Sequence, residues 1–171
     1  MDNKIYSLAT IILQNDIFKR LYPHLVEGVY SEQASDIVYS FPQSQKYLIM
    51  DECFIFNLHL VNRWLSSDSQ CNSLVARILK QCLSDYIPEL KYTEERLDIL
   101  LTLADKRNKE YFGRPIMDKR ITNNILWVFS GNISEMIFPG NPSHITLPIY
   151  MDMIEFLPTI LNKIELAAPN K

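Results

Sequence analysis

Glycine is scarce in this chain: only four of its 171 residues are glycine. Sheet proteins rich in hairpins need glycine in their tight turns, and phosphate-binding loops need it where the backbone approaches the ligand. Apolar residues make up 47% of the chain and charged residues 22%, which is enough apolar material for a core. We therefore expect an all-α protein, and the length indicates one domain covering residues 1–171.

Apolar residues at helical spacing predict three main helices. The clearest covers Thr93 to Tyr111. Gly113 and Pro115 should end it, because glycine accepts a left-handed cap and proline cannot continue the turn. A second helix covers Ser69 to Tyr86, and a third covers Gln45 to Leu65. The third is apolar over most of its circumference, so we expect it to be the central helix of the core.

Shorter helices should flank these three and give a bundle of about seven. They are residues 3–14, residues 16–30 disturbed at Pro23, residues 116–137 broken at Gly131, and residues 149–166 interrupted near Pro158. Alternating apolar residues also permit, without requiring, a short two-stranded edge that pairs residues 37–41 with residues 144–149.

Several features point to a cytoplasmic protein without a membrane partner. The first residues carry neither the leading positive charge nor the small residues before a cleavage point that a secretory signal requires. No uncharged stretch forms a continuous apolar helix of about 20 residues. Cys53, Cys71 and Cys82 contain no C-x-x-C pair, so we interpret them as reduced core thiols.

Known chemical motifs are missing from the sequence. It has no serine in G-x-S-x-G, no H-E-x-x-H and no G-x-x-x-x-G-K, so we expect no cofactor, no metal site and no enzyme activity. The nearest approach to an active site is Glu52, His59 and Arg63 on one face of the central helix. These three define a third hypothesis, a cryptic helical enzyme, although a structural role for them is the simpler interpretation.

Basic residues cluster between positions 106 and 120, with Phe112 among them. The net charge of −3 argues against a protein devoted to nucleic-acid binding. The cluster nevertheless defines an alternative function, binding of a nucleic acid or a phosphate ligand. Cations late in a helix also complement its dipole, which is the ordinary explanation. The candidate anion-binding residues are Arg107, Lys109, Arg114 and Arg120.

Residues 121–162 contain no lysine or arginine, and acidic side chains follow the outward stripe of the last predicted helix. The loop before it, residues 138–148, holds three prolines, and a stiff loop loses little entropy on binding. An acidic face without compensating cations attracts a basic partner. The candidate partner-binding residues are Glu135, His144, Asp152 and Glu155.

These observations favour a protein that acts by binding another protein, without chemistry of its own. Within that class, the small size and acidity favour an inhibitor or immunity-type protein that neutralises a basic partner such as a nuclease toxin.

Overall fold

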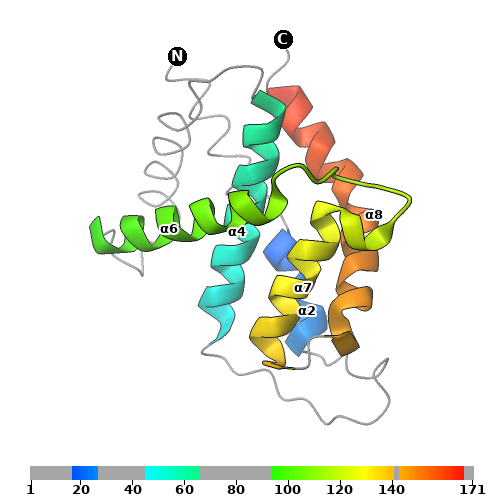
Figure 1. Ribbon diagram of the computed structural model, residues 1–171, viewed down its shortest axis with the longest axis horizontal. Coiled ribbons are helices and arrows are strands. Elements are labelled where there is room, and N and C mark those ends of the chain that lie inside the picture. The colour runs from blue at the N-terminus through cyan, green and yellow to red at the C-terminus, as the bar shows by residue number, and fades with distance from the viewer. Residues whose placement is uncertain (1–16, 27–44, 66–93, 141–142, 168–171) are drawn as a thin grey trace. The chain divides into compact units, whose positions relative to one another are not determined.

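The computed structural model describes residues 17–26, 45–65, 94–140 and 143–167 (Figure 1). These residues contain five α-helices and one 3-10 turn, and no strand occurs among them, so the all-α prediction is confirmed. The elements are α2 (Ile17–Val26), α4 (Lys46–Leu65), α6 (Glu94–Tyr111), η2 (Ile121–Asn123), α7 (Ile125–Ile137) and α8 (Ser143–Ala167).

The predicted total of seven helices is not confirmed. The segments 3–14, 37–41 and 69–86 lie outside the described residues. None of the described helices is both long and apolar enough to cross a membrane.

The chain divides into two compact units, and α4, α6 and α8 each contribute residues to both. Among the described residues, one unit contains residues 54–65, 94–109 and 159–167, and the other contains residues 17–26, 45–53, 110–140 and 143–158. The single domain over residues 1–171 stays a prediction.

Helix α6 confirms the clearest sequence prediction. Leu100 and Ala104 are buried on its inner side, as expected from their spacing. The chain leaves the helix through Gly113, whose φ of 70° is the left-handed conformation that glycine adopts without strain. Polar side chains cover the exposed side of α6; they are Asp98, Thr102, Asp105, Lys106 and Lys109.

Helix α4 is buried along most of its length, as its apolar composition predicts, but a central position in a seven-helix bundle is not confirmed. Tyr47 and Leu48 were expected in the core and are 45% and 51% exposed. Cys53 is a free, buried cysteine, and burial raises the pKa of its thiol well above the ordinary value. The buried apolar residues of α4 are Ile49, Cys53, Ile55, Phe56, Leu58, Leu60 and Val61.

Helix α7 begins nine residues later than predicted and is not broken at Gly131. Asn124 determines the start, because its side-chain oxygen accepts a hydrogen bond of 2.8 Å from the backbone N–H of Trp127. Residues 116–124 before it form a loop and the turn η2. Gly131 continues the helix, which shows that a single glycine costs too little to end a helix whose apolar face is buried.

Helix α8 begins at Ser143 and runs through Pro148 and Pro158. Residues 138–140 lie outside the helices as predicted, but the predicted loop is wrong from residue 143 onward. The predicted strand over residues 144–149 is wrong as well, since residues 143–149 are helical. The predicted interruption near Pro158 is also absent. Pro158 is exposed, so the carbonyl that its missing N–H leaves unbonded lies on the solvent side of the helix, where water can satisfy it.

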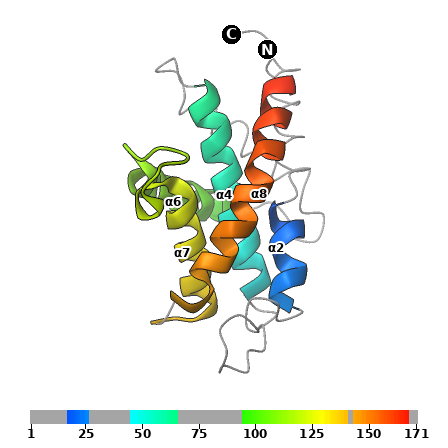
Figure 2. The same ribbon diagram turned by 90° about the vertical axis from the view of Figure 1, so that its right-hand side faces the viewer.

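Helix α7 and the part of α8 up to residue 158 lie side by side and run in opposite directions (Figures 1 and 2). Buried hydrogen bonds join them: Asn124 Nδ2 donates to Tyr150 Oη at 3.0 Å, and Thr146 Oγ1 donates to Ser134 Oγ at 3.0 Å. The rings of Trp127 and Tyr150 meet edge to face, with centroids 5.6 Å apart. These contacts fix which side of α8 faces outward.

Candidate functional site

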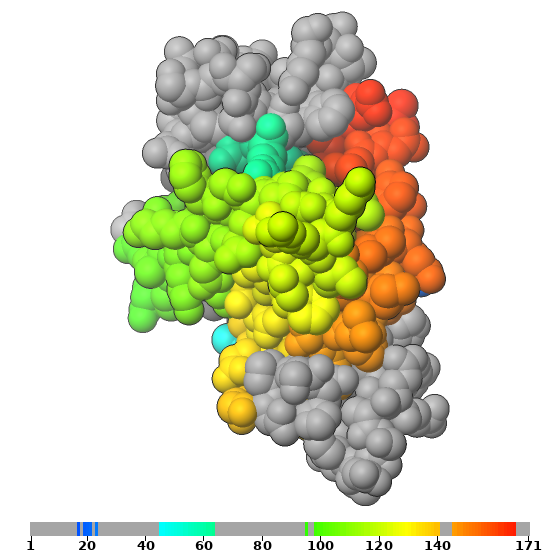
Figure 3. Space-filling model, turned by 45° about the vertical axis from the view of Figure 1, so that its right-hand side comes forward, coloured from blue at the N-terminus to red at the C-terminus, as the bar shows by residue number. Residues whose placement is uncertain are grey.

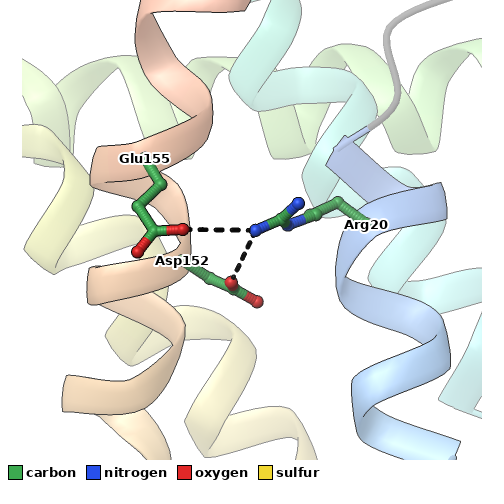
Figure 4. A network of polar contacts seen from close by, with 3 residues as sticks. All are labelled: Arg20, Asp152 and Glu155. Atoms are coloured by element: carbon green, nitrogen blue, oxygen red, sulfur yellow. Dashed lines mark hydrogen bonds and ion pairs between the residues drawn. The ribbon is translucent and has the colours of Figure 1, made fainter.

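The predicted acidic residues Asp152 and Glu155 come together on α8, and they share a cation from α2 (Figure 4). Arg20 Nη2 lies 3.3 Å from Asp152 Oδ1 and 3.4 Å from Glu155 Oε2. The side chain of Glu155 is 70% exposed, that of Arg20 40% and that of Asp152 13%. Solvent therefore reaches this cluster, and Glu155 most of all.

Arg20 changes the electrostatic prediction for this surface. The sequence suggested an acidic face without cations, because residues 121–162 contain none. Arg20 lies 132 residues from Asp152 along the chain and supplies part of the missing charge. Both contacts are longer than the roughly 2.7–2.9 Å of a strong charge-assisted hydrogen bond. Two carboxylates against one guanidinium still leave one net negative charge.

Apolar side chains continue the exposed face of α8 toward its N-terminus. Leu147 is 48% exposed and Met151 is 52% exposed. Leu147, Met151 and Glu155 follow one another at intervals of four residues, which places them in a row on one side of the helix. We call Leu147, Met151, Asp152 and Glu155 the α8 surface. It combines two apolar side chains with an acidic pair.

Of the other two predicted partner-binding residues, Glu135 lies outside the α8 surface, and the structure does not describe the side chain of His144. Glu135 is exposed near the end of α7, and its Oε1 accepts a hydrogen bond of 2.9 Å from the backbone N–H of Gly140. Gly140 has a φ of 82°, so Glu135 stabilises a turn that needs glycine. His144 lies in the first turn of α8, and its side chain is outside the described residues.

The predicted anion-binding residues occupy different environments. Arg107 is buried, and Lys109 Nζ pairs with Asp105 Oδ2 at 2.7 Å on the surface of α6. Arg114 supports its own loop, because its Nε donates to the carbonyl oxygen of Glu110 at 2.9 Å. Arg120 is exposed. Arg107 therefore belongs to the buried interior, and Arg114 stabilises its own loop. Binding of a nucleic acid or phosphate stays a prediction.

Sequence reasoning missed an exposed apolar loop between α6 and α7. Phe112 is 87% exposed, Met117 53% and Ile121 44%. The exposed cations Lys119 and Arg120 lie beside them in the sequence. Much of this loop is visible on the face of the molecule shown in Figure 3. We call Phe112, Met117, Lys119, Arg120 and Ile121 the 112–121 surface. The apolar residues from Ile116 onward suggested a helix, and that interpretation concealed the loop.

Hydrogen bonds hold this loop in a defined conformation. The backbone N–H of Arg114 donates to the carbonyl of Tyr111 at 3.1 Å, and that of Ile125 donates to the carbonyl of Pro115 at 3.0 Å. Asp118 accepts bonds from Asn123 Nδ2 at 3.0 Å and from the backbone N–H of Arg120 at 3.2 Å. These bonds stabilise the charged carboxylate, and they lower the pKa of Asp118.

The residues of the third hypothesis are buried or half-buried; they are Glu52, His59 and Arg63. Glu52 is fully buried. His59 Nδ1 donates to Asn108 Oδ1 at 2.9 Å. Burial lowers the pKa of His59 below its ordinary value, the bond to Asn108 opposes that change, and the positive charge of Arg63 adds to it. The imidazole is therefore neutral near pH 7 and serves as a hydrogen-bond donor.

Among the described residues, no group of three or more histidine, cysteine, aspartate or glutamate side chains is placed to hold a metal ion. No known protein family, no curated protein and no solved structure matches this chain.

Proposed function

We propose that this protein acts by binding a basic protein partner on its α8 surface, without chemistry of its own. The observation that supports the proposal is the arrangement on α8, where half-exposed Leu147 and Met151 lead directly to the acidic pair. Apolar anchors with a charged margin are the usual composition of a protein interface. Methionine in particular is enriched there.

The ion pairs of Arg20 with Asp152 and Glu155 are weak enough for a cation of the partner to replace Arg20. Exposed pairs of this kind contribute about 0–1 kcal/mol, so an incoming lysine or arginine can replace Arg20 at Glu155 at little cost. The remaining negative charge would increase the association rate with a basic partner, and added salt would reduce it. A small inhibitor or immunity-type protein that covers a basic partner such as a nuclease is the function we favour.

The test begins with recovery of the partner by pull-down from the native source and its purification. Association rates are then measured at low and high salt for the wild type, for Asp152→Lys/Glu155→Lys and for Asp152→Asn/Glu155→Gln. We expect the charge-reversed variant to associate about tenfold or more slowly at low salt. The neutral variant should show a smaller reduction.

Helix α6 provides the matched control. Glu95 and Asp98 are exposed and have the same three-residue spacing, so Glu95→Lys/Asp98→Lys changes the net charge equally at another place. Its rate should decrease much less than that of the α8 variant. Equal reductions would show that net charge alone is responsible, and an unchanged rate for Asp152→Lys/Glu155→Lys would show that the partner binds elsewhere.

A further inference from the structure

The α8 surface and the 112–121 surface carry opposite charges. The α8 surface combines Leu147 and Met151 with two carboxylates. The 112–121 surface combines three apolar side chains with two exposed cations. The apolar residues are Phe112, Met117 and Ile121, and the cations are Lys119 and Arg120. Each surface thus has the composition that would complement the other.

We propose that the 112–121 surface of one copy of this chain docks on the α8 surface of a second copy. Phe112 is 87% exposed and would be the principal anchor, since large aromatic side chains contribute most to interfaces. Lys119 and Arg120 would then face Asp152 and Glu155 of the neighbouring copy. There they would compete with Arg20, whose contacts of 3.3 and 3.4 Å are long.

The charges also determine the symmetry of the contact. If two copies met through the same surface, Lys119 and Arg120 would lie opposite the same cations. On the α8 surface, Glu155 would likewise approach another Glu155, and like charges facing each other oppose association. The favoured contact therefore joins different surfaces of the two copies, and with one such contact per pair it is head to tail. Such a contact adds further copies unless its geometry closes a ring.

The loop is prepared for this contact before it forms. Arg114 Nη1 donates to the carbonyl of Thr122 at 3.4 Å and its Nε donates to the carbonyl of Glu110 at 2.9 Å, so one guanidinium holds both ends of the segment. Asp118 is bonded to Asn123 within the same loop and is exposed as well, so Lys119 and Arg120 stand against one carboxylate and leave one net positive charge. Docking such an ordered loop costs little conformational entropy.

Sedimentation velocity of the full chain over a wide concentration range at low salt tests the proposal. The wild type should sediment faster as concentration rises, and added salt should reduce this association. Phe112→Ser and Met151→Ser should each weaken it about tenfold. Ile99→Ser replaces a side chain that is 50% exposed and belongs to neither surface, so it should associate like the wild type.

A mixing experiment distinguishes head-to-tail contact from a two-fold contact. Phe112→Ser retains its α8 surface, and Met151→Ser retains its 112–121 surface. A mixture of the two variants should form a one-to-one dimer that adds no further copies, at concentrations at which each variant alone is still monomeric. Failure of the mixture to dimerise would overturn the proposal, and so would a wild type that is monomeric at every concentration.

The same variants separate this inference from the proposed function. Phe112→Ser leaves the α8 surface intact, so it should lose self-association and still bind the basic partner. Asp152→Lys/Glu155→Lys should lose both, and combining it with Lys119→Glu/Arg120→Glu should restore self-association because the charges are exchanged between the two surfaces. If the combined variant stays monomeric, the assigned charge pairing is wrong.

Discussion

The part of helix α8 up to residue 158 makes polar contacts of two kinds, buried and exposed. Tyr150 meets Asn124 in the interior at 3.0 Å, whereas Asp152 and Glu155 meet Arg20 at the surface at 3.3 and 3.4 Å. A buried hydrogen bond cannot be replaced by water, so breaking it leaves a polar group unsatisfied. An exposed ion pair has water as an alternative partner. The first contact therefore fixes the position of α8, and the second leaves its surface open to exchange.

The largest expected effect comes from breaking the buried contact. Asn124→Ala removes the cap on the N–H of Trp127 and the donor to Tyr150 together. We expect the free energy of unfolding to decrease by about 2–3 kcal/mol, measured by urea denaturation. Asn123→Ala is the control, since Asn123 is exposed and its side chain bonds the exposed carboxylate of Asp118. Equal losses for the two variants would contradict the comparison.

A smaller effect is expected at the surface. Arg20→Met keeps much of the apolar stem and removes the charge that Asp152 and Glu155 share. The free energy of unfolding should decrease by less than about 1 kcal/mol. The same variant should associate faster with the basic partner, because the two carboxylates lose their compensating cation. A loss of stability as large as that of Asn124→Ala would show that Arg20 is structurally essential.

The smallest expected effect is the contribution of His59, which is half-buried, to the pH dependence of the free energy of unfolding. This contribution nearly vanishes at neutral pH. Its folded pKa is lowered, mainly by burial, so as pH falls the unfolded chain takes up a proton first, near pH 6.5. The free energy of unfolding should therefore decrease as pH falls below about 6.5 and level off below the folded pKa. His59→Gln should lack this part of the decrease in urea denaturation at several pH values. Identical pH profiles would contradict the assignment.

The ends of helices show how far local sequence signals reach. Gly113 ends α6 as predicted, because a left-handed cap is a local property of one residue. The start of α7 was missed, although Asn124 before an apolar run is a recognised N-cap signal. Gly131 and Pro158 were expected to break helices and do not. Burial of the apolar face outweighs the local cost at these positions.

The candidate site was predictable only along a single helix. Asp152 and Glu155 were expected on the outward stripe of the last helix, and their three-residue spacing suffices to place them on one side. Arg20 was not predicted as their partner because 132 residues separate it from Asp152. Phe112 was not predicted as a binding residue in its own right, because it had been interpreted as part of the basic cluster; its side chain is exposed.

One amide side chain links the beginning of α7 to the placement of α8. Asn124 uses its oxygen to cap α7 and its nitrogen to bond Tyr150, so both tasks depend on a single rotamer. If α8 were shifted along its axis, Tyr150 would move away and the amide would lose one of its two roles. The two helices should therefore form together during folding, and a state with only one of them in place should be sparsely populated.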